Sequence, residues 1–284
     1  MLIGLVADST AYLTQEQKTR YRIELVPINV HFEGRIYQDG VDLSIAQAYQ
    51  FLEKNPKDWA TSAPSPGNFL TAFRKLSEQG AKEILCLTLP QSVSATWNSA
   101  RMAKNLAQTE IPGVRIEVMD SGTAAVGETL MLLKIAEAIE KGANFQEIIK
   151  LAETLRSKIR VYILLETIRY IYRSGRIPEV ASKLGALLPL KPILGIHGGK
   201  LHFTGATTSM GKSKERIIKN LKEAWDGNLP EIGLTYIDNS DETREIKEEI
   251  SSLLPSSHIY ISEFSPIVGY ATGQGTIAVG YFVK

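Results

Sequence analysis

The chain has 284 residues, of which 44% are hydrophobic and 22% charged, and its 32 basic and 31 acidic side chains leave a formal net charge of +1. This length suits one large domain or two ordinary ones, and the balanced charge excludes a general attraction to nucleic acid or to an anionic membrane surface. With a single cysteine, Cys86, and no apolar run of the ~18 residues that a membrane span needs, we expect a cytoplasmic protein without disulfides or membrane insertion.

Strand-like and helix-like segments alternate through the first half of the chain. Apolar runs typical of buried strands cover residues 2–9, 23–32, 83–89 and 115–121. Segments of helical composition follow over residues 14–21, 42–55, 65–80, 93–108 and 123–142. The alternation predicts a parallel sheet covered on both faces by helices, with Cys86 as a small buried core residue.

The second half has a different texture. Two short strands, 192–197 and 200–207, flank Gly198-Gly199, which is the signature of an antiparallel hairpin. Further strands are predicted over residues 161–166, 231–238, 258–272 and 276–282, and helices over 145–158, 212–225 and 241–254. We therefore predict an α/β protein of two domains: residues 1–158 with a parallel sheet, and residues 159–284 of α+β type with a mixed or antiparallel sheet.

Hydroxyl and carboxyl groups follow three of the predicted parallel strands. The clusters are residues 8–10 (DST), 92–96 (SVSAT) and 120–123 (DSGT). Because parallel strands deliver ligands at their carboxyl ends, three such clusters favour a site at this edge of the sheet. Ser, Thr and Asp are also preferred helix N-caps, so capping remains the alternative for each cluster taken alone.

Two further loops can contact an anion. In the stretch 60–67 (ATSAPSPG), Thr61 and Ser62 can donate hydrogen bonds while two prolines restrict the backbone; a plain helix cap is the alternative. Near the end of the chain, glycines at 273 and 275 interrupt a strand-like run. They let the backbone turn tightly, and their N–H groups can face an anion or simply close an ordinary turn.

The common catalytic and cofactor patterns are incomplete or missing. No histidine pair has zinc-ligand spacing, no GxSxG elbow is present, and the glycine patterns around 211 and 273 complete no nucleotide fingerprint. A chain with ligand-type loops but no evident acid, base or nucleophile reads as a binding protein. We therefore expect no metal and no cofactor.

Taken together, these loops resemble the DegV family of bacterial lipid-binding proteins. The order VADST, VPINVHFEGRIYQDGVDLS, TSAPSPGNF, LPQSVSATWNSA, VMDSGTAAVG, LETIRYIYRSGRI, LPLKPILGI and VGYATGQGTIAVGYF carries the resemblance from the first strand to the last. It implies a two-domain α/β protein that holds one long-chain, palmitate-like fatty acid in a tunnel between its domains. It also implies a non-catalytic subunit that presents the carboxylate to a separate ATP-dependent fatty acid kinase subunit, which makes an acyl phosphate.

The resemblance also implies site residues. The carboxylate-binding residues of the family map onto Thr61 and Ser62 in one loop and onto Ser94, with Thr96 beside it, in another. The headgroup loop of the family maps onto residues 271–275, namely Ala271, Thr272, Gly273, Gln274 and Gly275. Ala271 stands where the family has a histidine, and Gln274 stands where it has a proline. These differences leave open whether this chain works with a kinase.

Arg173 and Arg176 map onto a loop that the resemblance makes partner-facing; a solvated basic turn is the alternative.

Two other functions stay open. One is a small-molecule enzyme at the carboxyl edge of the first sheet, with Asp8 or Asp120 as acid or base. The other is a kinase-independent module that signals lipid status through this arginine loop.

Overall fold

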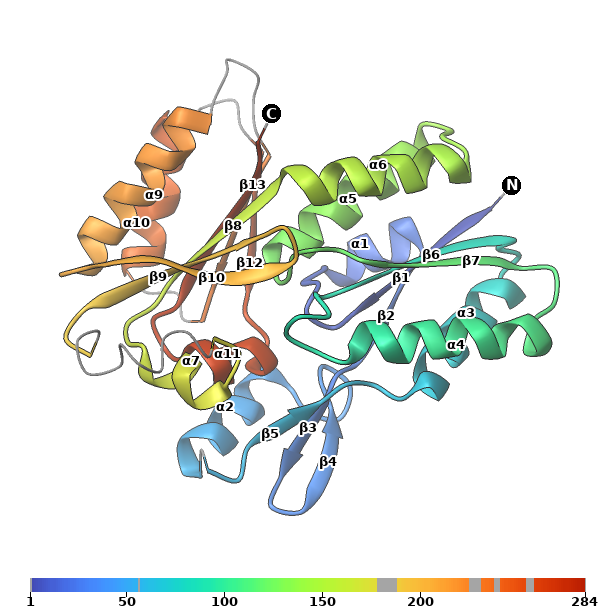
Figure 1. Ribbon diagram of the computed structural model, residues 1–284, viewed down its shortest axis with the longest axis horizontal. Coiled ribbons are helices and arrows are strands. Elements are labelled where there is room, and N and C mark those ends of the chain that lie inside the picture. Colours follow the sequence, from blue (N-terminus) through green and yellow to red (C-terminus); the bar gives the residue numbers. More distant parts are fainter. Residues whose placement is uncertain are drawn as a thin grey trace.

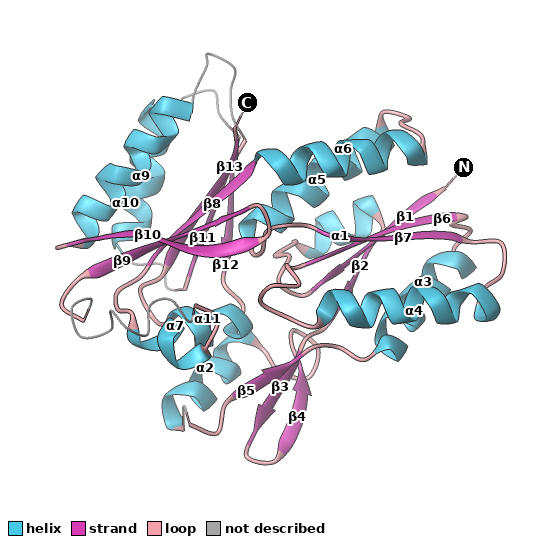
Figure 2. Cartoon of the chain, in the orientation of Figure 1, coloured by secondary structure: helices cyan, strands magenta, loops and turns pink. Residues whose placement is uncertain are grey.

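The structure is a computed structural model that describes residues 2–55, 57–177, 188–224, 231–237, 241–253 and 258–283. Three sheets organise the described chain, one of four strands, one of six and one of three (Figure 1, Figure 2). The four-stranded sheet uses only residues before 158, and the six-stranded sheet only residues after 158. The last residues of three predicted elements, at 225, 238 and 254, lie outside the described residues.

The four-stranded sheet is parallel, with the strand order β2-β1-β6-β7, as the sequence predicts. Its strands are β1 (Ile3–Asp8), β2 (Ile23–Val26), β6 (Glu83–Thr88) and β7 (Arg115–Asp120). Val6 and the fully buried Cys86 share a core with helices α3 (Pro66–Glu78) and α4 (Thr96–Glu110). Leu5 and Leu87, on the alternate face, pack with α5 (Val126–Glu140) and α6 (Phe145–Lys158), while α1 (Gln15–Tyr21) packs beside β2.

The three-stranded sheet is antiparallel and corrects one prediction. Its order is β4-β3-β5, from β3 (Asn29–Phe32), β4 (Arg35–Gln38) and β5 (Ala60–Ser62), and it packs with α2 (Ile45–Lys54). The single strand predicted over 23–32 is wrong, because the chain leaves the first sheet at Val26 and enters this one at Asn29. Pro27 lies between the two strands and has no N–H to donate to a continuous ladder.

The six-stranded sheet is mixed and has the order β10-β9-β8-β13-β11-β12. Its strands are β8 (Ile159–Leu164), β9 (Lys191–His197), β10 (Lys200–Thr207), β11 (Ile232–Tyr236), β12 (Ile259–Glu263) and β13 (Ile277–Phe282). Only β11 and β12 pair in parallel, and β9 and β10 form the predicted hairpin. One face of this sheet shares a core with α9 (Met210–Ala224) and α10 (Asp241–Leu253), and the other faces α5.

Two short helices lie at the edge of the cavity described below, and one of them replaces a predicted strand. They are α7 (Arg169–Ser174) and α11 (Pro266–Thr272), which pack against each other. The strand predicted over 258–272 is therefore wrong beyond residue 263. Ser265 accepts a hydrogen bond from the Ile267 N–H, Pro266 occupies the first turn, and Gly273 with φ 87° ends the helix. This is the capping pattern of a helix rather than of a strand.

Helix α5 joins the two large sheets through very close packing. Val126, at its first turn, lies against Gly280 of β13, where an added Cβ would come within 3.0 Å of its Cγ1. Gly233 of β11 faces the same valine, and a Cβ on Gly127 would come 2.6 Å from Val161 of β8. Because no side chain fits at these positions, α5 and the six-stranded sheet form one tightly packed unit.

Candidate functional site

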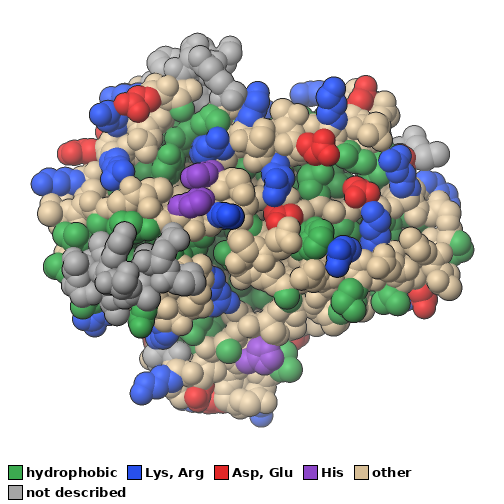
Figure 3. All heavy atoms as spheres, viewed as in Figure 1, with side chains coloured by type: hydrophobic (Ala, Val, Ile, Leu, Met, Phe, Trp, Pro, Cys, Tyr) green, Lys and Arg blue, Asp and Glu red, His purple; other side chains and the backbone are tan. Residues whose placement is uncertain are grey.

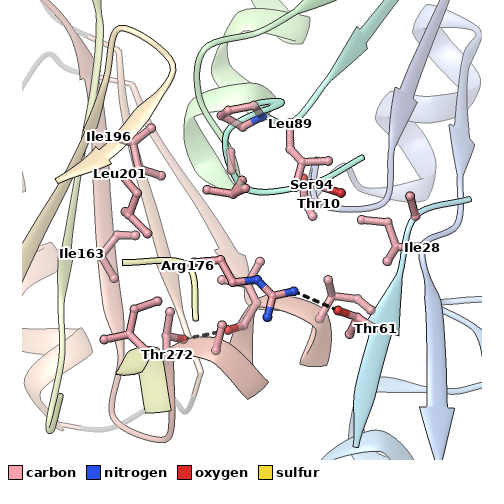
Figure 4. A pocket seen from close by; sticks show the side chains of 18 of the residues that line it. Thr10, Ile28, Thr61, Leu89, Ser94, Ile163, Arg176, Ile196, Leu201 and Thr272 are labelled. Carbon is pink, nitrogen blue, oxygen red and sulfur yellow. Dashed lines mark hydrogen bonds between the residues drawn. The ribbon is translucent and has the colours of Figure 1, made fainter. Parts of the chain in front are cut away.

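A cavity of about 450 Å³ lies between the loops of the four-stranded sheet and the inner face of the six-stranded sheet (Figure 4). This volume falls within the range of small-molecule sites. Its walls are mainly apolar and come from both halves of the chain, including Ile28, Ile163, Leu194, Ile196, Leu201 and Ile267. The polar side chains that line it are hydroxyls, apart from one guanidinium, that of Arg176. The arrangement suits a mostly apolar ligand with one polar end.

Strand β5 contributes two hydroxyls to the wall. Thr61 Oγ1 accepts a hydrogen bond of 3.3 Å from Nη2 of Arg176, and Ser62 also lines the cavity. His31 of the neighbouring strand β3 places Nε2 2.7 Å from Ser62 Oγ, and Asn29 Nδ2 donates to the same oxygen at 3.4 Å. The β3–β5 pairing of Asn29 with Ser62 fixes these side chains side by side.

The loop between β6 and α4 contributes a third hydroxyl. Ser94 lines the cavity, and its Oγ lies 2.8 Å from Thr96 Oγ1 and accepts a 3.3 Å bond from the Thr96 N–H. Thr96 itself is fully buried and does not line the cavity, so it orients Ser94. Because Ser94 and Ala95 directly precede the 15-residue helix α4, the positive end of its dipole faces the cavity.

The two arginines that the sequence groups together occupy different places. Arg173 is exposed, and its guanidinium stacks on the rings of Tyr170 and Tyr270. Arg176 is half-buried and reaches into the cavity toward Thr61, as Figure 4 shows. Gly175, with φ 71°, ends α7 and reverses the chain between them. Within the described residues, no carboxylate lies within ion-pair distance of Arg176.

The C-terminal segment meets the cavity only in part. Ala271 and Thr272, in the last turn of α11, line it, whereas Gly273 and Gly275 are not among its lining residues. The N–H of Gly273 donates to Gly269 O at 2.7 Å, and the Thr272 hydroxyl donates to Val268 O. Both donors therefore serve the helix end. Gly273 and Gly275 both have positive φ. The ring of Tyr170 lies so close to Gly273 that any side chain there would collide with it.

The two carboxylates of the enzyme alternative serve the loops that carry them. Asp8 is fully buried and accepts bonds from Thr10 N, Thr10 Oγ1 and Leu89 N, although burial raises the pKa of its carboxyl. Asp120 accepts bonds from the N–H groups of Gly122 and Gln91. Neither side chain lines the cavity. Their geometry is that of turn-stabilising groups rather than of an acid or base facing a substrate.

Sequence reasoning missed two of the polar groups in this region. From the sequence, Arg176 is expected on an outer, partner-facing surface. No role is predicted for His31, whose ring contacts the Ser62 hydroxyl. The signal for Arg176 was the Ser174-Gly175 pair before it, which marks the reversal that turns it inward. For His31 the only signal was its place in a strand, since the pairing partner β5 was expected to be a loop.

Other classes of site find no support in the described part of the chain. Among those residues, no three His, Cys, Asp or Glu side chains come together as metal ligands, and no helix has the length and apolar character to cross a bilayer. Figure 3 shows acidic and basic side chains interspersed over the face in view, with no large field of one sign.

Comparison with known proteins gives the same fold over the full length. A DegV domain-containing protein of Clostridium acetobutylicum is 27% identical over 286 residues, covering 99% of both chains. A solved DegV family protein from Thermus thermophilus, described by its fatty acid binding, superposes with a TM-score of 0.90 at 28% identity, covering 100% of both chains. A stearic acid-binding protein from Eubacterium ventriosum gives 0.87 at 26% identity, covering 100% of this chain and 99% of its own.

The family comparison covers nearly every residue. The family model described as "Uncharacterised protein, DegV family" matches residues 2–284. The resemblance drawn from eight loop motifs and the two-domain α/β architecture are thereby confirmed. This chain therefore belongs to the DegV family.

Proposed function

We propose that the chain binds one long-chain fatty acid in the cavity between its two large sheets and has no catalytic activity of its own. The observation that carries the proposal is a guanidinium, Arg176, that has no acidic partner among the described residues and lines an otherwise mainly apolar cavity. A half-buried cation favours a carboxylate as its counter-ion. Fatty acid binding by the relatives from Thermus thermophilus and Eubacterium ventriosum supports the same ligand class.

The carboxylate is best served where Thr61, Ser62 and Ser94 gather near Arg176. Their hydroxyls and the guanidinium can donate to both carboxylate oxygens, and the N-terminus of α4 adds a favourable dipole. The tail then extends along Ile163, Ile196 and Leu201 of the six-stranded sheet, which Figure 4 shows on the opposite side of the cavity. In this arrangement Thr96 orients Ser94. Ala271 and Thr272 shape the wall, and Gly273 and Gly275 shape the turn behind it.

The energetics fit a long acyl chain. Burying about sixteen carbons at ~0.8 kcal/mol per CH₂ gives roughly 12 kcal/mol of gross driving force. Ordering the chain and losing translational freedom offset several kcal/mol of this. Charge-assisted hydrogen bonds of ~1.5–3 kcal/mol each roughly cancel the cost of burying the carboxylate. The tail therefore sets the affinity, and the polar groups set the orientation.

Presentation of the ligand to an ATP-dependent kinase subunit is the finer part of the proposal. Arg173, exposed on α7 beside the cavity, is the group placed to meet such a partner, in the cytoplasm. Ala271 stands where the family has a histidine, so it offers no imidazole at this wall. His31, whose Nε2 lies 2.7 Å from Ser62 Oγ, places an imidazole beside the site instead. The measurement is the formation of acyl phosphate when the loaded protein is mixed with ATP and the ATP-binding subunit of a fatty acid kinase. If no more product forms than in a control without the protein, presentation to a kinase is contradicted.

Solvent extraction tests the central proposal. Protein purified from a bacterial host and extracted with chloroform–methanol is expected to release about one C16–C18 fatty acid per chain by mass spectrometry. The Arg176→Gln variant is the control, since it keeps the apolar wall and is expected to release less. A protein that releases no fatty acid, and that takes none up from added palmitate, contradicts the proposal.

A further inference from the structure

A buried carboxylate, Asp39, lies beside the cavity without lining it. Its backbone N–H donates to the carbonyl of Ile28 at 3.0 Å, and its Oδ2 accepts a 2.7 Å bond from the Ser9 hydroxyl. Ser9 Oγ in turn accepts a 3.1 Å bond from the Ile28 N–H. Both backbone groups of Ile28, a cavity-lining residue, are therefore fixed by Asp39 and its partner.

The same carboxylate oxygen also holds a neighbouring segment of the wall, from the second half of the chain. Ser265 Oγ donates to Asp39 Oδ2 at 2.9 Å and accepts the Ile267 N–H at 3.1 Å, as the N-cap of α11. Ile267 also lines the cavity and packs in the same hydrophobic cluster as Ile28. One oxygen atom thus joins a loop of the first 158 residues to α11, a helix of the second half that also lines the cavity. Asp39 and Ser265 are 8% and 5% exposed, so water competes little for these bonds.

We propose that Asp39 is a positioning residue which, through Ser9 and Ser265, latches together two neighbouring cavity-lining segments, one from each half of the chain, and so controls how long a bound fatty acid is retained. The inference rests on the proposed function for its ligand. Without the carboxylate, the hydroxyls of Ser9 and Ser265 lose their shared acceptor, which removes a hydrogen-bonded link between α11 and the segment around Ile28. Separation of α11 from the segment around Ile28 would open a path by which the bound fatty acid leaves the cavity.

The charge on Asp39 gives the latch a pH dependence of definite sign. Burial raises the pKa of Asp39 to about 6, against the opposing effect of the two serine hydroxyls, and the nearby Asp8 raises it further. Opening hydrates the carboxyl and returns its pKa toward the ordinary 3.8. Proton binding therefore favours the closed state. As the pH rises through about 6, the buried charge makes opening easier and ligand release faster.

Other ionisable groups face the same region. Beside Asp8, those that line the neighbouring cavity of about 650 Å³ with Asp39 are Tyr12, Lys18, Glu24, Lys75, Tyr260 and Glu263. Lys75 is paired with Glu24. Burial raises the pKa of Tyr260 to about 12, so its hydroxyl stays protonated near pH 6. Burial also raises the pKa of Glu263, which makes Glu263→Gln the matched control for pH effects.

The test is the dissociation rate of the fluorescent C18 fatty acid cis-parinaric acid, measured by stopped flow from pH 5 to 7.5. Wild-type protein is expected to release it roughly tenfold faster at pH 7.5 than at pH 5. Asp39→Asn keeps one acceptor oxygen and is expected to stay slow at both pH values. Asp39→Ala, which removes the acceptor, is expected to release it at least roughly tenfold faster at pH 7. Glu263→Gln and Asp42→Asn, a nearby exposed carboxylate, should behave as wild type.

Two outcomes overturn the latch: an Asp39→Ala rate equal to wild type, or a full wild-type pH dependence in Asp39→Asn. Should Asp39→Ala fail to fold, Ser265→Ala decides by the same rate. Should wild-type protein bind no cis-parinaric acid, the proposed function fails instead. The latch is then judged by hydrogen exchange of the Ile28 and Ile267 amides in ligand-free protein, which must quicken in Asp39→Ala.

Discussion

The two sides of the cavity differ in chemistry and in origin. The side built by β8, β9 and β10 is aliphatic, with Ile163, Ile196 and Leu201, and belongs to a continuous sheet. The opposite side is built by loops and by the short strand β5, and it carries Thr61 and Ser94. A sheet face offers a large, rigid apolar surface, whereas loop ends offer hydroxyls and N–H groups. In the proposed binding mode, the difference means that affinity and orientation are set by separate parts of the fold.

The largest expected effect comes from filling the aliphatic side. Ile196→Trp places an indole where the acyl chain is proposed to lie, and excluding about four CH₂ groups costs about 3 kcal/mol, or roughly 200-fold in palmitate affinity. Isothermal titration calorimetry measures the change. Ile36→Trp, at a 63% exposed position on β4, is the matched control and should bind as wild type. Equal affinity of Ile196→Trp and wild type would show that the tail does not use this wall.

A smaller loss is expected on the polar side from Arg176→Gln. Losing one charge-assisted bond to a carboxylate costs about 2 kcal/mol, or about thirtyfold in palmitate affinity. The methyl ester of palmitate, which has no charge, should bind both proteins equally. Arg169→Gln, an exposed arginine on the same helix α7, is the control. If Arg176→Gln loses as much affinity for the ester as for the acid, the arginine acts through packing rather than through charge.

The smallest effect is expected from Ser94→Ala. This change removes one uncharged donor to the carboxylate, a bond at the low end of the ~1.5–3 kcal/mol range, so a loss of about 1.5 kcal/mol or roughly twelvefold in palmitate affinity is expected. The melting temperature should also fall slightly, because Ser94 Oγ accepts the Thr96 N–H at the start of α4. Ser99→Ala, one turn further along this helix, is the control. A loss of a hundredfold or more would reverse the comparison, since the polar side would then dominate affinity.

Much of the fold could be predicted from local pattern. Alternating apolar runs and helices identified the parallel sheet, and Gly198-Gly199 identified the β9–β10 hairpin. The errors fell on short apolar stretches, where period alone does not separate strand from helix. Residues 266–272 form a helix because Ser265 and Pro266 start it and Gly273 ends it, signals that were present but outweighed by apolar composition.

The candidate site was only partly predictable, for a physical reason. Ser94 follows the strand-like run 83–89, so its place at the carboxyl edge of the sheet follows from topology. Thr61 and Ser62 were expected in a loop and lie in β5 of the three-stranded sheet, so their approach to Ser94 depends on how the sheets pack. The inward turn of Arg176 depends on the left-handed conformation of Gly175, and the role of Asp39 depends on Ser265, which lies 226 residues away in the chain. Contacts across such distances are set by how the sheets pack, which no local pattern encodes.

The close packing of α5 has a mechanical consequence. Because Gly280 and Gly233 lie close against Val126, little room is left between α5 and the six-stranded sheet, and we expect a movement that separates the two large sheets to leave this contact intact. The edge that would separate instead is bordered by α11 and β3, which lie below α5 in Figure 1. Asp39 and its two serine partners lie at that edge, so their hydrogen bonds are the contacts that such a movement would break.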